Sequence, residues 1–295
     1  MSGPAGPVAV TGATGFLGGG VARRLLARGV TPRLVVRDRA RLDDVLGGVD
    51  DVREATYGDA AAMTAALEGV DTLYLVSAAE DARRVDQHVT AVDAAVAAGV
   101  RRIVYTSFQN ASPDATFTFV RDHFATEVHV RSTGVEHTFV RSALYTDFLP
   151  GMVGDDGVLR GPAGDPDGGR VSWVARDDIC DVIAAVLLAA PPEEVLEVTG
   201  PEALTVAETL AVLSEVVGRE ITYVAEGLDE ARASRRAAYE AEPFEIEGWV
   251  TTYAAIAAGE LDVVADTVAR LAGHPPTPVR EWLLAHPEAY ARLLP

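Results

Sequence analysis

The chain has 295 residues, 48% of them hydrophobic, which suits one large α/β domain carrying a smaller lobe. Its formal net charge of −19 excludes nucleic acid and anionic membrane surfaces as expected partners. The single cysteine, Cys180, falls in an apolar helical stretch, and the six histidines show no HExxH spacing. We therefore expect a buried thiol, no internal disulfide and no metal site. The apolar runs are too short for a bilayer and no signal-peptide pattern precedes the first strand, so we expect a cytoplasmic protein.

Short apolar runs alternate with helical patterns through the first half of the chain. Strands are expected at residues 7–12, 33–36, near Val52, and at 72–76, 102–106 and 136–141. The helix after the fourth strand has Val85, Val89, Val92 and Val96 at helical spacing. Such alternation predicts βαβ units. We therefore expect an α/β fold with a Rossmann-type, doubly wound parallel sheet covered by helices on both faces.

The pattern changes after Arg141. Residues 151–169 are rich in Gly, Asp and Pro, which predicts a loop excursion with room for one hairpin. Strands are expected at residues 170–174 and 194–200, and a helix that starts near Asp177 is expected to return to the main sheet with the first of them. The T-x-x-E pair of Thr205 and Glu208 starts a further helix, which Gly218 ends. We expect a main domain over residues 1–200, with a lobe excursion at about 143–169, and a small, mostly helical lobe over residues 201–295.

A glycine triplet lies between the first strand and the first helix. Gly12 allows the tight turn, Gly15 lets the backbone approach a pyrophosphate, and Gly18 lets the helix pack closely on the strand. The start of the helix adds free N–H groups and a positive dipole end. The triplet therefore predicts a dinucleotide site, with Thr14, Phe16 and Leu17 in the same turn.

The end of the second strand distinguishes two dinucleotides. Arg37 can pair with the 2′-phosphate of NADP, so we expect NADP(H) to be preferred, and the next residue, Asp38, leaves NAD(H) as an alternative. Asp59 either contacts the adenine amino group or caps the next helix. The residues expected beside the nicotinamide riboside end the fourth and fifth strands and are Val76, Ser77, Ala78 and Thr106.

Several stretches together resemble the NmrA-like branch of the extended short-chain dehydrogenase/reductases. They are TGATGFLG, VVRD, YGD, GVRRIVYTS, HFATEVHVRSTGVEHTFVR and EVTGPEALTVAETLAVLSEVVGREITYV, and the resemblance runs from about Val8 to about Pro278. In pattern the chain is most similar to the type 2 NAD(P)H:quinone oxidoreductases. The resemblance implies that residues 1–200 bind NAD(P) and that the lobe lies on the substrate side.

The chain departs from the Ser–Tyr–Lys set that ordinary members use. The corresponding helix carries His123 and Glu127 at the same i, i+4 spacing, and Val128 stands where some relatives have lysine. His123 then either replaces the tyrosine as proton donor or makes a His–Glu contact without chemistry. The place of the catalytic serine belongs to Ser107 or to Phe108. Glu127 is expected near the cofactor.

Three functions fit these residues. The one we expect is an NAD(P)H-dependent oxidoreductase that transfers hydride from NADPH to a quinone or a similar electron-poor small molecule, which needs no tyrosine or lysine because the anion formed is stabilised by resonance. The alternatives are a non-catalytic NADP(H)-binding redox sensor acting through a protein partner, and a reductase or isomerase of a specialised metabolite. Phe108, Tyr145 and Phe148 either line the substrate site or pack in the core. A homodimer is an open alternative to a monomer.

Overall fold

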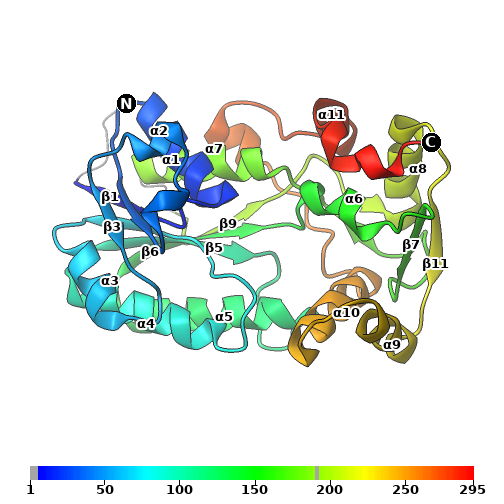
Figure 1. Cartoon of the computed structure of the whole chain (residues 1–295), viewed down its shortest axis with the longest axis horizontal. Helices are drawn as coiled ribbons and strands as arrows, with labels where there is room; N and C mark the ends of the chain where they lie inside the picture. The colour runs from blue at the N-terminus through cyan, green and yellow to red at the C-terminus, as the bar shows by residue number, and fades with distance from the viewer. Residues whose placement is uncertain (1–5, 190–192) are drawn as a thin grey trace.

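A seven-stranded parallel sheet forms the centre of the molecule, in the order β3-β2-β1-β4-β5-β6-β9 (Figure 1). The computed structural model describes residues 6–189 and 193–295. The strands are β1 (Val8–Thr11), β2 (Arg33–Val36), β3 (Val52–Glu54), β4 (Thr72–Leu75), β5 (Arg102–Phe108), β6 (Glu136–Ser142) and β9 (Val195–Val198). The strand order reverses between β1 and β4, which is where ligands bind in doubly wound sheets.

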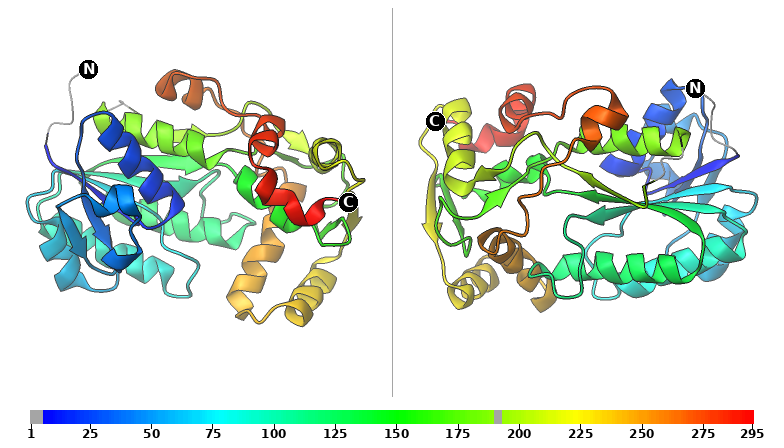
Figure 2. Two further views of the ribbon diagram at one scale, coloured as in Figure 1. Left: turned by 45° about the horizontal axis from the view of Figure 1, so that its top comes forward. Right: turned by 180° about the vertical axis from the view of Figure 1, so that it is seen from behind.

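Helices cover both faces of this sheet, as Figures 1 and 2 show. One face carries α1 (Phe16–Ala27), α2 (Asp44–Gly47) and α7 (Arg176–Leu188), and the other carries α3 (Ala60–Leu67), α4 (Arg84–Ala97) and α5 (Thr118–Ser132). Successive strand residues point to opposite faces, so Val10 packs with α1 and α7 whereas Ala9 packs with α3 and α4. Because both faces are buried, the strands are apolar throughout. The expected Rossmann-type fold is confirmed.

A second lobe is assembled from two separate stretches of the chain. Its elements before residue 200 are η2 (Thr146–Phe148), α6 (Leu149–Met152), β7 (Val158–Gly161) and β8 (Arg170–Val171). Those after residue 200 are β10 (Leu204–Thr205), α8 (Val206–Val217), β11 (Thr222–Ala225), α9 (Leu228–Ala238), α10 (Pro243–Ala257), α11 (Val279–Ala285) and η4 (Pro287–Leu293). Between α10 and α11 the chain returns to the main domain, where η3 (Val268–Ala272) packs against α7. β7 pairs in parallel with β11, which joins the two stretches.

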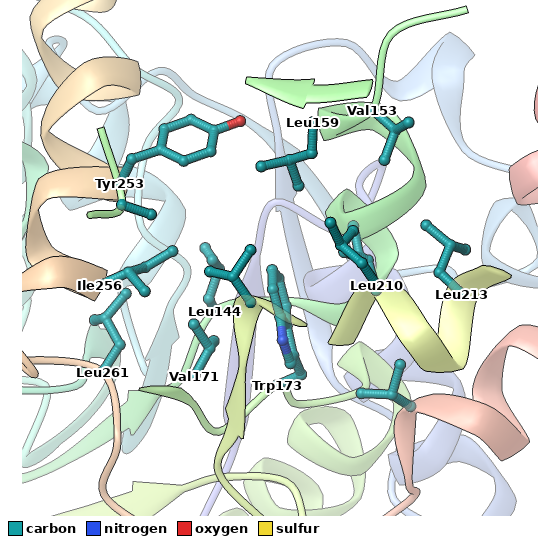
Figure 3. Close-up of a cluster of buried hydrophobic side chains, with 14 of the residues drawn as sticks. Leu144, Val153, Leu159, Val171, Trp173, Leu210, Leu213, Tyr253, Ile256 and Leu261 are labelled. Atoms are coloured by element: carbon teal, nitrogen blue, oxygen red, sulfur yellow. The ribbon is translucent and has the colours of Figure 1, made fainter. Parts of the chain in front are cut away.

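One apolar core holds the lobe together. Figure 3 shows Leu144, Leu159, Trp173, Leu210 and Tyr253 converging from the end of β6, from β7, from the segment after β8, and from α8 and α10. The indole N–H of Trp173 donates a hydrogen bond to the Thr209 hydroxyl at 3.2 Å, so the buried ring has no unpaired donor. The core begins where β6 ends, and it therefore fixes the lobe against the carboxyl ends of the sheet.

Two expectations for the lobe are wrong. The segment 170–174 does not join the main sheet: only Arg170–Val171 forms a strand, β8, which pairs antiparallel with β10. β9 already occupies the sheet edge beside β6, so the edge is closed to this segment. The expected hairpin in residues 151–169 is a single bridge between Val153 and Leu159, because β7 pairs with the distant β11 instead.

The local expectations for α8 and for Cys180 are confirmed. Thr205 and Glu208 form the reciprocal capping box of α8, and Gly218 ends that helix in the left-handed conformation. Cys180 is buried against Gly20 of α1, and burial raises the pKa of its thiol to about 12. Within residues 6–189 and 193–295 no helix is long and apolar enough to cross a bilayer. The same described residues contain no cluster of His, Cys, Asp and Glu that could hold a metal ion.

Candidate active site

A cavity of about 710 Å³ opens where the strand order reverses between β1 and β4. It is the position at which the carboxyl ends of parallel strands leave a crevice for a ligand. Seven of the residues predicted to bind the cofactor line this cofactor cavity, namely Gly12, Thr14, Gly15, Arg37, Val76, Ser77 and Ala78. These residues follow three strands, β1, β2 and β4, so segments far apart in the sequence form one wall.

The three glycines are needed for three different physical reasons. Gly12 has φ +62, which side chains rarely adopt. A Cβ on Gly18 would lie 2.3 Å from the carbonyl oxygen of Gly12, so only glycine allows α1 to pack this closely on β1. Gly15 has φ −104, and a Cβ there would approach only the Gly12 oxygen, at 3.4 Å. Nothing inside the protein therefore requires glycine at position 15, whereas a ligand seated on the start of α1 would.

The floor of the cofactor cavity is held by hydrogen bonds that link β1 and β4. The Thr11 hydroxyl oxygen accepts a hydrogen bond from the backbone N–H of Val76 at 2.9 Å and lies 2.6 Å from the hydroxyl of Tyr57. Tyr57 in turn donates to the carbonyl oxygen of Val76 at 2.7 Å. Tyr57 was not among the residues predicted from the sequence, and its one signal there is its place just after the third strand.

At the end of the cofactor cavity next to β2 and β3, arginine side chains line the wall and the neighbouring carboxylates are engaged elsewhere. Arg37 and Arg41 line the wall. The carboxylate of Asp38 instead accepts from the backbone N–H of Ala40 and caps η1 (Arg39–Arg41). The carboxylate of Asp59 accepts from the backbone N–H of Ala62 and so caps α3. Of the two roles expected for Asp59, adenine contact or helix cap, the structure shows the cap. This end of the cavity therefore presents positive charge.

Besides Asp59, five predicted cofactor residues lie outside the cavity wall. Gly18 and Leu17 pack α1 onto the sheet and α7. The Thr106 hydroxyl is buried 2.8 Å from that of Tyr74. Phe16 is 43% exposed, with the guanidinium of Arg176 4.1 Å above its ring. The fifth is Glu127, whose position is described next.

Glu127 sits in a buried ionic network. The Ser107 hydroxyl donates to its Oε1 at 2.6 Å, and Arg141 donates to both carboxylate oxygens, at 2.8 and 2.6 Å. Arg131, one turn along α5, adds a contact at 3.3 Å. Glu197 on β9 lies 3.7 Å from Arg141, and burial raises its pKa to about 7. Both predicted residues, Ser107 and Glu127, thus bind protein groups here and do not reach the cavity.

His123 is buried behind Phe108, with its ring centroid 6.2 Å away. Its Nδ1 lies 3.0 Å from the Tyr105 hydroxyl, and its Nε2 lies 3.1 Å from a guanidinium nitrogen of Arg84. Because arginine can only donate, Nε2 accepts and the ring is neutral with its proton on Nδ1. Burial, and then the charge of Arg84, hold the pKa of His123 well below its usual value. Arg84, and not Glu127, is therefore the charged neighbour of this ring, and the neutral form is favoured.

A second buried histidine, missed in the sequence, supports the loop after β4. His88 Nε2 accepts from the backbone N–H of Ala78 at 2.8 Å, and Nδ1 lies 2.8 Å from the Thr126 hydroxyl. Burial lowers the pKa of His88 to about 3, so it stays neutral. The Arg84 guanidinium also donates to the Ser77 hydroxyl. Two cavity-lining residues, Ser77 and Ala78, are thereby fixed by α4.

A second cavity, of about 720 Å³, opens between the sheet and the lobe, and we call it the acceptor cavity. Its apolar wall is largely aromatic and includes Phe117, Phe148, Tyr239, Trp249 and Tyr253. Of the three residues predicted to bind substrate, Phe148 lines it and is 50% exposed. The ring of Phe108 packs behind Phe117, with centroids 5.4 Å apart, and that of Tyr145 packs behind Phe148 at 5.3 Å.

Each charged group that lines the acceptor cavity on the lobe side has a partner within the protein. Arg235 pairs with Glu226, and Arg160 lies 2.7 Å from Asp156. Asp147 is paired with Arg176, whose guanidinium also lies 5.9 Å from the Phe148 ring. The cavity therefore presents aromatic surface and neutralised charge.

Comparison with known proteins places the chain among reductases. A relative from Streptomyces griseus subsp. griseus, described as (4-alkanoyl-5-oxo-2,5-dihydrofuran-3-yl)methyl phosphate reductase, is 36% identical over 290 residues, which is 96% of this chain and 99% of the relative. The crystal structure of an NADPH-dependent quinone oxidoreductase from Escherichia coli complexed with NADPH superposes with a TM-score of 0.84 at 30% identity, covering 94% of this chain and 99% of that chain. That of Citrobacter sp. triphenylmethane reductase complexed with NADP(H) superposes with a TM-score of 0.79 at 29% identity, covering 98% and 100%. The NmrA-like family profile matches residues 4–256, and the chain belongs to the NmrA-like family.

Proposed function

We propose that this protein is an NAD(P)H-dependent oxidoreductase that transfers hydride from NADPH to an uncharged, quinone-like aromatic molecule. The observation that carries the proposal is the pair of adjoining cavities, one built on the glycine turn and the other walled by aromatic side chains. Reductases of the same family that use NADPH with quinones or dyes support it. We assign cofactor binding to residues 1–200 and the substrate side to the lobe at 143–169 and 201–295.

The residues of the cofactor cavity fit NADPH. Gly15 leaves room for the pyrophosphate at the start of α1, where unpaired N–H groups point outward. Arg37 and Arg41 offer cations for a 2′-phosphate, while Asp38, which would bind the ribose hydroxyls of NAD, is engaged in capping η1. NAD(H) is therefore the weaker alternative. When bound, the nicotinamide supplies the hydride.

The chemistry does not depend on a Tyr–Lys pair. The chain contains no lysine, since all 25 basic residues are arginine. His123, the residue nearest in pattern to the missing tyrosine, is neutral, and Arg84 occupies its Nε2. A quinone suits this arrangement because hydride addition gives an anion that its own ring stabilises. The protein then contributes to the hydride transfer by holding the two rings in contact.

The acceptor cavity favours an uncharged substrate. A phosphate ester needs arginines that are free to pair with it, because burying an unpaired anion is costly. Both arginines that line this cavity are already paired with carboxylates, and the same wall adds Glu80 and Asp147. The phosphate ester named for the Streptomyces relative is therefore disfavoured here, although the two chains are similar throughout.

The test is NADPH oxidation followed at 340 nm with two acceptors at equal concentration, an uncharged naphthoquinone and the same ring carrying a phosphate ester. A reaction without acceptor is the blank. We expect turnover with the naphthoquinone and a kcat/KM at least about tenfold lower with the phosphorylated compound, which corresponds to about 1.4 kcal/mol. NADPH binding without oxidation by any acceptor would contradict the proposal and favour the redox-sensor alternative. The net charge of −19 supports a small-molecule substrate without a nucleic acid partner.

A further inference from the structure

Glu80 lies at the boundary between the two cavities. It belongs to the loop that connects β4 to α4, and it lines both the cofactor cavity and the acceptor cavity. Among the described residues it is the only one that the two walls share. From the lobe, the indole N–H of Trp249 on α10 approaches its Oε2 at 3.4 Å. The carboxyl group therefore lies beside any ligand that spans the two cavities.

The surroundings of Glu80 favour its protonated form. Partial burial raises the pKa of the carboxyl, and Glu245 on α10 acts in the same direction. The hydrogen bond from Trp249 and the charge of Arg84 oppose this rise but do not cancel it. The other charged residues that share its loop or the cavity walls on either side are Asp81, Arg83, Asp147 and Arg235. The residue is exposed to solvent, so water can restore its proton.

Reduction of a quinone to a quinol needs a proton as well as a hydride. The C4–H bond of NADPH breaks and its electron pair goes with the hydrogen to the quinone, which leaves NADP⁺ and a hydroquinone monoanion. That anion must then take a proton on oxygen. We infer that Glu80 donates this proton: its carboxyl O–H bond breaks, the phenolic O–H bond forms, and the resulting carboxylate is reprotonated by water. This inference rests on the function proposed above.

The other candidate donors are in the wrong place. His123 is neutral and buried, and its one ring proton, on Nδ1, faces Tyr105. Both oxygens of the Glu127 carboxylate are occupied by Arg141 and Ser107. The phenols of Tyr239 and Tyr253 line the acceptor cavity but not the cofactor cavity. Glu80 is the carboxyl group that meets both ligands.

The experiment compares Glu80→Gln with the wild type and with Glu68→Gln. Glutamine keeps the size of the side chain and an oxygen that accepts from Trp249, but it has no proton to transfer. Glu68 is exposed and lines neither cavity, so Glu68→Gln makes the same chemical change away from both ligands. Two acceptors are used: an uncharged naphthoquinone, which needs a hydride and a proton, and a cationic triphenylmethane dye, whose central carbon needs only the hydride.

For the wild type we expect the kcat for the naphthoquinone to fall as pH rises through the pKa of Glu80, because only the protonated carboxyl donates. Glu80→Gln should lower that kcat on the order of 10²-fold and abolish the pH dependence, whereas the kcat for the dye should change by less than about threefold. Glu68→Gln should keep the wild-type kcat and pH profile. NADPH affinity, measured by fluorescence, serves as the check that each variant is folded.

The outcomes separate the two proposals. A wild type that binds NADPH and reduces neither acceptor overturns the proposed function. If the wild type is active, two results overturn the role of Glu80 and leave the proposed function standing. One is that Glu80→Gln keeps the wild-type pH profile with the naphthoquinone, and the other is that it lowers the kcat for both acceptors equally. If the wild type reduces only the naphthoquinone, the pH profile of Glu80→Gln decides by itself.

Discussion

The glycine turn offers a direct test of the cofactor site, because two of its glycines are required for different reasons. In Gly15→Val the new side chain meets only the Gly12 oxygen, and it projects into the cofactor cavity. In Gly18→Ala the new Cβ would lie 2.3 to 2.4 Å from backbone atoms of Gly12 and Thr11, which cannot move without shifting β1. The first change should therefore damage binding and the second should damage folding.

The magnitudes follow from what each side chain displaces. Each hydrogen bond from a backbone N–H to a charged phosphate is worth about 1.5–3 kcal/mol, so losing two in Gly15→Val should raise the Kd for NADPH about 10²- to 10⁴-fold. Replacing glycine at this N-cap position should cost about 1 kcal/mol of stability. Gly18→Ala should cost about 3 kcal/mol or more, because the overlap is with backbone.

Thermal unfolding with and without NADPH measures both effects. At a concentration of about 100 times the Kd, the ligand stabilises the wild type by about 2.7 kcal/mol, which should raise Tm by roughly 5–10 °C. Gly15→Val should unfold near the wild-type Tm and show almost no rise. Gly47→Val is the control, because a Cβ at Gly47 meets nothing within 4 Å and the residue is not on the cavity wall. A full NADPH-dependent rise in Gly15→Val would refute this placement of the pyrophosphate.

Three further substitutions test other parts of the site. Arg37→Asp should reverse or erase the preference for NADPH over NADH, which calorimetry can measure; equal affinities in the unmodified protein would contradict the assignment. In the wild type, burial raises the pKa of Glu197 to about 7, against 4.5 in the unfolded chain. At about 1.36 kcal/mol per pKa unit, this difference limits the effect of Glu197→Gln on the free energy of unfolding to about 3 kcal/mol. Because the folded state holds this proton more tightly than the unfolded chain, the wild type loses that stability as pH rises from about 4.5 to 7. Urea unfolding should therefore show Glu197→Gln to be more stable than the wild type by about 1–2 kcal/mol at pH about 8. Near pH about 4 the two proteins should be equally stable. His123→Gln should leave the kcat for a quinone within about threefold of the wild type, and a loss of about 10²-fold with the fold intact would restore His123 as a catalytic acid.

Much of the fold and one end of the site follow from local sequence. The alternation of apolar strands and helical patterns predicted the parallel sheet, because burial on both faces leaves a local signature in each strand. Gly12, Gly15 and Gly18 predicted the tight turn between β1 and α1, since backbone geometry and close approach each favour glycine at a fixed spacing. Arg37, singled out by its distance from that turn, lines the same cavity.

The tertiary structure alone decided the partners of the buried polar groups. Glu127 is one turn from His123 in the sequence, yet it pairs with Arg141 from β6, and Arg84 from α4 approaches His123 instead. The boundary position of Glu80 depends in the same way on Trp249, 169 residues away. Local patterns record which side chains are buried and which turns are tight. They do not record which elements meet, and for a buried charge the nearest partner determines both its protonation and its role.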